Sequence, residues 1–205
     1  MIWLPGILTA YAILAVGTLS PGPAVALLLG IGATDGRRAA LATCLGIAAG
    51  SMTLNLLTLA GIGLLLSQMA WAMSALKLFG AAYLVWLAWG AFRRALAPPV
   101  IAPQTARATG ARLVQGYLLQ VTNPKAVGFW LAISAVGAVT SAPIWVVALY
   151  VLGGGLLSFA GHATWAIALS SPAFRHAYAS ARSGIEAALG LFFGFAAYKL
   201  ATSEG

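Results

Sequence analysis

Three long stretches of this chain, residues 1–34, 39–76 and 126–174, contain no Asp, Glu, Lys or Arg. A helix needs about 20 apolar residues to cross a lipid bilayer, so the two longer stretches must each fold back at a turn. Charged residues make up 7% of the chain, whereas soluble domains contain about a quarter. We therefore predict an all-α membrane protein that crosses the bilayer several times.

Several other classes of protein are disfavoured by the same residues. Residues 1–20 lack the basic start of a secretory signal peptide, so we interpret them as part of the first span. The single Cys44 allows no internal disulfide. The net charge of +8 comes mainly from short loops, where membrane orientation explains it better than nucleic-acid binding. The sequence contains no Gly-x-x-x-x-Gly-Lys loop for ATP, and we expect no cofactor and no metal.

The apolar stretches predict six membrane-spanning helices. The first, at about 3–33, and the fourth, at about 113–139, are each broken near the middle. The other four cover about 39–66, 71–92, 144–169 and 184–200. A long loop at 97–112 divides the chain into a three-helix unit at 1–96 and a second one at 113–205.

Basic residues alternate between the predicted loops and indicate the orientation. The first, third and fifth loops contain arginines, whereas the second and fourth contain no charge. Loops rich in Lys and Arg stay on the cytoplasmic side, so we expect both termini on the outer side of the membrane. Trp3, Trp71 and Trp145 then fall at the outer ends of spans, as an interfacial aromatic belt would place them.

Proline-containing breaks interrupt the first and fourth spans. They are Ser20-Pro21-Gly22-Pro23 and Asn123-Pro124-Lys125. A proline removes a backbone hydrogen bond that lipid cannot replace, and a charge at the bilayer centre costs about 2.5–3.5 kcal/mol on insertion scales. Such features are tolerated where they line a cavity within the protein. The alternative interpretation is that the prolines only kink long helices.

The two breaks correspond to each other at an offset of 102 residues, which aligns Ser20 with Thr122 and Gly22 with Pro124. Three spans in each unit give the units opposite orientations, so we predict two inverted repeats whose broken helices face each other at the midplane. Amides that start the second half-helices favour a carboxylate, and carbonyls that end the first half-helices favour an ammonium. We therefore expect a pocket for a small zwitterion.

Candidate substrate-binding residues lie mainly at the breaks. They are Ser20, Pro21, Gly22, Pro23, Asn123, Pro124, Lys125, Lys77 and Asn55. Lys125 is expected to bind the substrate or a counter-ion, or else to pair with carbonyls that the break sets free. Asn123 either caps the second half-helix or contacts the substrate. Lys77 either extends to the outer interface or contacts a substrate carboxylate, and Asn55 needs a polar partner, which the cavity would provide.

Proton coupling or gating is assigned to four further candidates. They are His162, Glu186, Asp35 and Ser51. Histidine titrates near neutral pH, which makes His162 a candidate for proton coupling, and a hydrogen-bonded core histidine is the alternative. Glu186 follows Ser183 at the spacing of a capping box, so it either starts the sixth helix or couples protons. Asp35 is either a solvated charge beside the arginines of the first loop or part of a cytoplasmic gate.

Five motifs follow one another along the chain. They are Ser20-Pro21-Gly22-Pro23, Gly36-Arg37-Arg38-Ala39, Gly46-Ile47-Ala48-Ala49-Gly50, Lys77-Leu78-Phe79-Gly80-Ala81-Ala82-Tyr83-Leu84 and Asn123-Pro124-Lys125-Ala126. Together they resemble the lysine-exporter (LysE/RhtB) family of bacterial amino-acid exporters. The resemblance implies a six-helix inner-membrane exporter of small amino acids or related metabolites, coupled to protons. Two acids common in the family are absent, because Ser51 follows Gly50 and the fifth span reads Gly161-His162-Ala163-Thr164-Trp165.

The charges near the breaks are basic, so a cationic substrate would lack a counter-ion there. We expect a secondary exporter of a small neutral or anionic amino acid, or of a related metabolite, that works by alternating access. A passive channel and an exporter of another solute are the alternatives. An intramembrane enzyme is disfavoured because no paired acids, metal-ligand cluster or Ser/His/Asp group converges at one depth. The Gly46-x-x-x-Gly50 and Gly190-x-x-x-Gly194 motifs fit a homodimer interface as well as internal packing.

Overall fold

The computed structural model describes residues 3–68, 72–97, 108–137 and 142–202. Within these ranges the chain is helical, and no strand occurs there. The helices are α1 (Leu4–Leu19), α2 (Pro23–Thr34), α3 (Gly36–Gln68), α4 (Ala72–Leu96), α5 (Thr109–Thr122), α6 (Pro124–Gly137), α7 (Ile144–Ala168) and α8 (Pro172–Thr202). The prediction of an all-helical protein is therefore confirmed.

Both proline segments interrupt helices. The α1 and α2 helices meet at a bend of 48°, and Asn123 alone separates α5 from α6. By length and composition, α3 over Gly36–Gly61 and α7 over Ile144–Ala168 can cross a membrane. Within the described ranges, α1 with α2 is a third candidate if the bent pair is one span. The six spans and their repeat stay a prediction.

The last helix begins earlier than the sequence suggested. Pro172 starts α8, where its fixed φ and missing N–H are well suited, and the Phe174 N–H donates to the Ser171 hydroxyl at 3.5 Å. Ser183 and Glu186 therefore lie inside the helix, and the interpretation of Glu186 as half of a capping box is wrong. The spacing was misleading because residues three apart also face each other on successive turns of a helix interior.

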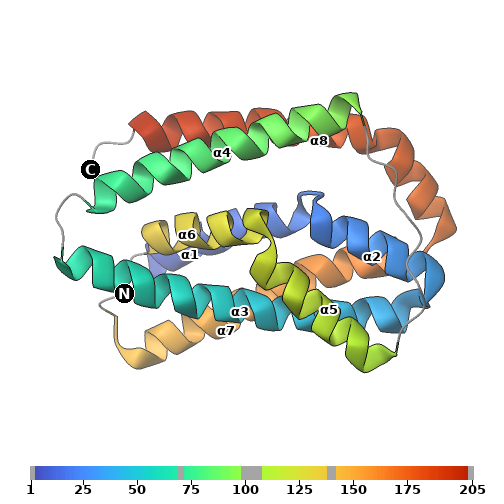
Figure 1. Ribbon diagram of the computed structural model, residues 1–205, viewed down its shortest axis with the longest axis horizontal. Coiled ribbons are helices and arrows are strands. Elements are labelled where there is room, and N and C mark those ends of the chain that lie inside the picture. The colour runs from blue at the N-terminus through green and yellow to red at the C-terminus, as the bar shows by residue number, and fades with distance from the viewer. Residues whose placement is uncertain (1–2, 69–71, 98–107, 138–141, 203–205) are drawn as a thin grey trace.

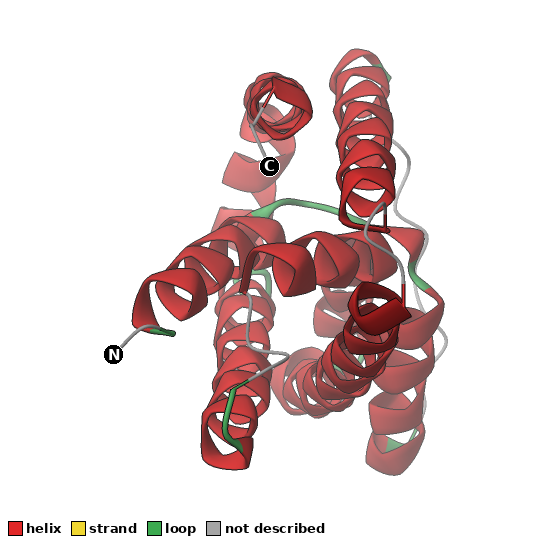
Figure 2. Cartoon of the chain, turned by 90° about the vertical axis from the view of Figure 1, so that its left-hand side faces the viewer, coloured by secondary structure: helices red, strands yellow, loops and turns green. Residues whose placement is uncertain are grey.

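The helices form two layers, seen from the side in Figure 1 and from one end in Figure 2. One layer consists of α4 and α8, which lie side by side along their length. The other six helices form a bundle, which α4 contacts mainly through α6. Both termini lie at the same end of the molecule (Figure 1).

Glycines permit the closest helix contacts. A Cβ on Gly46 would overlap the backbone of α5, and a Cβ on Gly116 would overlap that of α3. Gly190 packs on Phe92 of α4, because a Cβ there would lie 2.8 Å from a ring carbon. These glycines therefore serve packing within the chain, and a homodimer stays a prediction. Gly36, with φ of 79°, makes the tight connection between α2 and α3.

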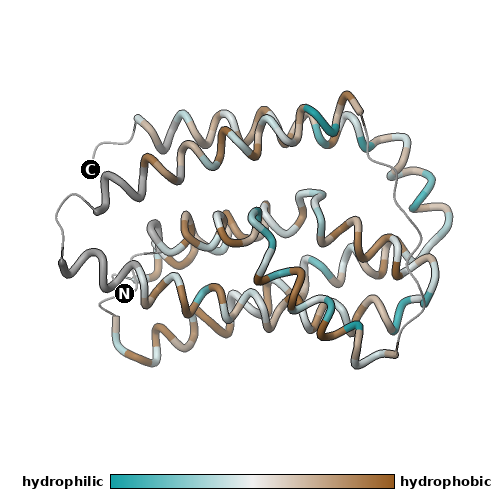
Figure 3. Tube along the Cα trace, viewed as in Figure 1, coloured by the Kyte–Doolittle hydropathy of each residue, from teal (hydrophilic) through white to brown (hydrophobic). Residues whose placement is uncertain are grey.

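Apolar side chains form two buried clusters inside the bundle and also cover its outer surface. One buried cluster surrounds Trp130 and Tyr150, and another surrounds Leu28 and Ile47. Exposed apolar side chains include Leu57, Leu78, Phe79, Trp89, Leu156 and Phe195. An outer surface this apolar fits contact with lipid. Figure 3 shows hydrophilic residues gathered at the end opposite the termini and at the junction of α5 and α6.

Candidate functional site

A residue of the second break stabilises the first break. The Lys125 ammonium, in the first turn of α6, donates to the carbonyl oxygens of Ser20 at 2.9 Å and Pro21 at 3.5 Å, and to the Ser20 hydroxyl. Carbonyls at a helix end have no intrahelical donor, and Lys125 supplies one. The structure thus shows the pairing with freed carbonyls that the sequence left open. The role of Lys125 in substrate binding stays a prediction.

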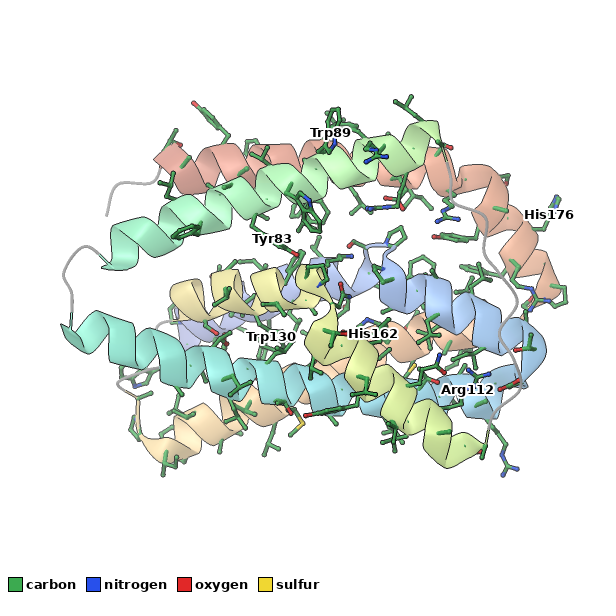
Figure 4. The ribbon with its side chains drawn as sticks, viewed as in Figure 1. Tyr83, Trp89, Arg112, Trp130, His162 and His176 are labelled. Carbon is green, nitrogen blue, oxygen red and sulfur yellow. The ribbon has the colours of Figure 1, made fainter. Side chains whose placement is uncertain are left out.

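The second break is stabilised by a cap from its own residues and by a contact from α4. The Asn123 side-chain oxygen accepts a hydrogen bond from the backbone N–H of Lys125 at 3.0 Å, which confirms the capping role. Pro124 begins α6, where a missing N–H leaves nothing unsatisfied. The Tyr83 hydroxyl donates to the Pro124 carbonyl, and a Cβ on Gly128 would overlap the Tyr83 ring. This contact fastens α4 to the start of α6, and Figure 4 shows Tyr83 directed toward the bundle.

A cavity of about 40 Å³, here called the central cavity, lies where the two breaks meet. Helices α1, α2, α5, α6 and α7 all contribute to its lining, and the polar members include Ser20, Gln120, Asn123, Lys125, Ser158 and His162. Figure 4 shows His162 and Trp130, which also lines the cavity, in the interior. A cavity of roughly 150 Å³ holds benzene. The central cavity is therefore too small for an amino acid in this conformation.

Buried polar side chains connect three helices beside the central cavity. Gln120 donates from Nε2 to the Ser51 hydroxyl at 2.8 Å, and the Ser51 and Ser158 hydroxyls lie 2.8 Å apart. His162 Nδ1 lies 2.8 Å from the Ser158 carbonyl oxygen. Because a carbonyl oxygen only accepts, Nδ1 carries the proton. The structure thus brings together His162 and Ser51, two residues that the sequence singled out separately.

The polar side chains continue along α3 beyond Ser51. Asn55 lies one turn further and is fully buried, and its Nδ2 and Oδ1 have no hydrogen-bond partner among the described residues. A Cβ on Gly154 of α7 would lie 3.3 Å from the Asn55 Nδ2. In the following turn the Thr58 hydroxyl lies 2.7 Å from that of Ser134. Asn55 is not among the described residues that line the central cavity, and its contact with substrate stays a prediction.

Asp35 forms a buried ion pair between α2 and α5. Arg112 Nε donates to Asp35 Oδ2 at 2.8 Å, and the Arg112 and Asp35 side chains are 0% and 8% exposed. The expectation of a solvated charge beside Arg37 and Arg38 is therefore wrong. Arg112 reaches Asp35 because α5 packs backbone to backbone against α3. The pair lies at the end opposite the termini, where Figure 4 labels Arg112, and its role as a gate stays a prediction.

A second cavity, here called the side cavity, has a volume of about 190 Å³ and lies between α2, α4 and α8. Glu186 Oε1 accepts a hydrogen bond from Arg94 Nε at 2.9 Å and joins α8 to α4. The Glu186 side chain is 1% exposed and that of Arg94 is 32% exposed. Arg182 and Tyr178 also line this cavity. The role of Glu186 in coupling or gating stays a prediction.

A family model described as LysE type translocator matches residues 15–204. The chain belongs to this family. The translocator is 28% identical over 188 residues to an uncharacterized membrane protein, YahN, of Escherichia coli (strain K12). These aligned residues make up 88% of the chain and 82% of the relative. It is 31% identical over 124 residues to the threonine efflux protein of the same strain, covering 58% and 60%. It is 33% identical over 142 residues to the chemotactic transduction protein ChpE of Pseudomonas aeruginosa, covering 68% and 70%. No solved structure matches the chain.

Membership in this family confirms the resemblance that the five motifs indicated. The family is one of translocators, so the protein is a membrane transport protein rather than an enzyme. Sequence reasoning missed Gln120 and Ser158, although a polar side chain within an apolar span is itself a signal of function or pairing. Lys77 lies in α4, and its side chain is outside the described residues.

Proposed function

We propose that this translocator is a secondary active exporter of a small neutral or anionic amino acid, or of a related metabolite, in the bacterial inner membrane. The observation that carries the proposal is the meeting of two broken helices at a polar cavity, with Lys125 bound to the other break. Broken helices of transporters present backbone amides and carbonyls to the solute. These groups recognise a carboxylate and an ammonium, respectively.

The charge of the central cavity supports a substrate without net positive charge. Among the described lining residues, Lys125 is present and no carboxylate occurs, so a cationic amino acid would meet a like charge. The threonine efflux protein among the relatives supports a neutral amino acid. In the proposed complex the substrate carboxylate contacts Lys125 and the amides after Pro23 and Pro124. The substrate ammonium contacts the carbonyls just before the breaks.

Alternating access by two inverted three-helix units, residues 1–96 and 113–205, is the proposed mechanism. Helices in equivalent positions of two such units meet at the axis that relates them. In support, α3 packs on α7, the second span of each unit, and Ser51 bonds with Ser158 at this contact. The third spans, α4 and α8, also pack on each other. The Asp35–Arg112 pair is the proposed closure of the cytoplasmic end.

Proton coupling is assigned to His162 in this proposal. His162 is a buried titratable side chain at the central cavity, and its Nδ1 is committed to the Ser158 carbonyl. The second ring nitrogen then exchanges the proton. Glu186 is the alternative coupling residue.

Counterflow in proteoliposomes tests the proposal with labelled threonine, alanine, aspartate and arginine, with and without a pH gradient. We expect uptake of neutral or acidic amino acids that rises with the gradient, and accumulation above the outside concentration. A passive channel would only equilibrate the solute. Arginine as the best substrate would overturn the substrate class, and uptake indifferent to pH would remove proton coupling. Protein-free liposomes are the control.

A further inference from the structure

We infer that the side cavity is a second binding site for a zwitterionic amino acid, with the carboxylate held by arginines and the start of α2 and the ammonium held by Glu186. This inference rests on the proposed function, because it assigns another site to the same class of substrate. The side cavity is distinct from the central cavity. Both are lined by Gly22, Pro23 and Val25 of the first break, and their other lining residues differ.

The size of the side cavity suits a small amino acid. Its volume is about 190 Å³, against about 40 Å³ for the central cavity. A cavity of roughly 150 Å³ accommodates benzene, which has as many non-hydrogen atoms as alanine. In this conformation the side cavity therefore has room for the substrate that the central cavity lacks.

Positive groups line the side cavity from two directions. Arg94 of α4 and Arg182 of α8 form one wall, and α2 begins at the other with Pro23. Gly22 precedes α2 and gives it no side-chain cap, so first-turn amides have no capping partner. The positive end of the α2 dipole thus lies at the cavity. A carboxylate between these walls gains charge-assisted hydrogen bonds from the arginines and is favoured by the positive end of the α2 dipole.

Glu186 provides the complementary negative charge. Its Oε1 accepts a hydrogen bond from Arg94, whereas its Oε2 is buried and has no hydrogen-bond partner among the described residues. Buried carboxylate oxygens are normally hydrogen-bonded. An ammonium group has three N–H donors to offer such an atom. The cavity therefore contains a partner for each end of a zwitterion.

The remaining wall fits an uncharged or acidic side chain. Val25, Ala26 and Leu29 of α2 give it an apolar surface. On the α8 side, the Arg182 guanidinium lies 6.0 Å from the centre of the Tyr178 ring, a cation–π contact. Among the described residues that line the side cavity, the arginines outnumber the carboxylates. A neutral or acidic amino acid is compatible with this excess, whereas lysine or arginine would be repelled by it.

The first break is a common wall of both cavities. Gly22, Pro23 and Val25 line the central cavity on one side and the side cavity on the other. Gly22 has no side chain, and a Cβ there would lie 3.1 Å from the Lys125 ammonium nitrogen of the central cavity. A substrate in the side cavity is therefore separated from the central cavity by a single chain segment. The side cavity is thus a second position on the same transport path.

Protection of a cysteine from labelling tests the site in the full-length protein. Cys44 is replaced by Ala, and the Ala26→Cys substitution places a thiol in the side cavity. The matched control is Ala33→Cys, an exposed position on the same helix outside the cavity. Purified protein in micelles reacts with a methanethiosulfonate reagent in the presence of alanine, threonine, aspartate or arginine. We expect the first three to slow labelling of the Ala26→Cys variant, arginine to slow it least, and none to affect the control.

Substitutions of the charged residues that line the side cavity show whether they bind the amino acid. Arg94→Gln and Glu186→Gln should raise the amino-acid concentration needed for protection by about tenfold or more, since each removes a charge-assisted hydrogen bond. Arg93→Gln is the matched control, because Arg93 is exposed and does not line the cavity. Circular dichroism and size-exclusion chromatography confirm folding. The protection assay on the Ala26→Cys variant can be interpreted even if these charge substitutions prevent folding, because it retains Arg94 and Glu186.

Each outcome separates this inference from the proposed function. If no amino acid protects the cysteine but counterflow is observed, the side-cavity site is overturned and the proposed exporter function is retained. Absence of both protection and counterflow would overturn both. If phosphatidylethanolamine in the micelles slows labelling and no amino acid does, the cavity belongs to a lipid headgroup, which also overturns the inference.

Discussion

The two helix breaks differ in what stabilises them. At the second break, Asn123 caps α6 through a bond to a residue only two positions away. At the first break, the carbonyl ends of Ser20 and Pro21 depend on Lys125, which is 105 residues from Ser20, and α2 begins at Gly22 without a side-chain cap. The start of α6 at the second break thus has a local cap besides the Tyr83 contact, whereas the carbonyls at the first break depend on a tertiary contact alone.

This difference indicates which break moves. A locally capped helix end keeps its geometry when neighbouring helices shift, because its partner moves with it. An end held by a residue of another helix changes whenever that helix is displaced. We therefore expect the first break to respond to movement of α6 and the second to act as the fixed reference. Cavities on both sides of the first break are consistent with this assignment.

Replacing Lys125 with Ala should have the largest effect on this comparison. The substitution removes the donor to the Ser20 and Pro21 carbonyls and the cation of the central cavity. We expect transport to be lost while the protein remains in the membrane, and stability to fall by about 1–3 kcal/mol because buried acceptors lose their partner. Counterflow and thermal unfolding measure the two effects. Near-normal flux would remove Lys125 from the mechanism.

Gly22→Ala disturbs the same contact from the other side and should have an intermediate effect. Gly22 has an extended backbone that any residue adopts, with φ of −171°. An added Cβ would however lie 3.1 Å from Lys125 Nζ and 3.2 Å from its Cδ, so Lys125 must shift. We expect reduced but measurable counterflow and a loss of about 0.5–3 kcal/mol in stability.

Gly184→Ala is the matched control for this substitution, because a Cβ there meets nothing within 4 Å. The control should retain wild-type counterflow. If the two alanine variants behave alike, the contact between Gly22 and Lys125 does not matter for transport.

Asn123→Ala should affect transport least, because it leaves the first break untouched. Loss of the cap should lower stability by about 0.5–2 kcal/mol, whereas Asn123→Asp, which retains a capping oxygen, should restore most of it. Thermal unfolding of the two variants in the same detergent measures the difference. A greater loss of counterflow here than in the Lys125→Ala variant would reverse the assignment of the moving break.

Local features of the fold could be predicted from the sequence. Proline interrupts a helix whatever its surroundings, so both breaks were visible in the residues that form them. Asn123 directly before Pro124 likewise indicated a cap, which the structure contains. The five motifs indicated the family. In each case the relevant partners lie within a few residues or in an ordered set of short segments.

The pairing of charged residues could not be predicted in the same way. Asp35 pairs with Arg112, 77 residues away, rather than with the neighbouring arginines. Glu186 pairs with Arg94, 92 residues away, rather than capping a helix. Which helix faces meet depends on packing, and glycine contacts such as that of Gly46 with α5 decide it. The side cavity follows from the same packing, and for that reason no local pattern indicated it.

The wall shared by the two cavities has a consequence for the leakage of ions across the membrane. Gly22, Pro23 and Val25 line both cavities, so a displacement of these residues toward one cavity narrows it and widens the other. We therefore expect movement of this segment toward either cavity to keep the two cavities separate. With such a wall, a solute can cross the membrane without dissipating the ion gradients across the same bilayer.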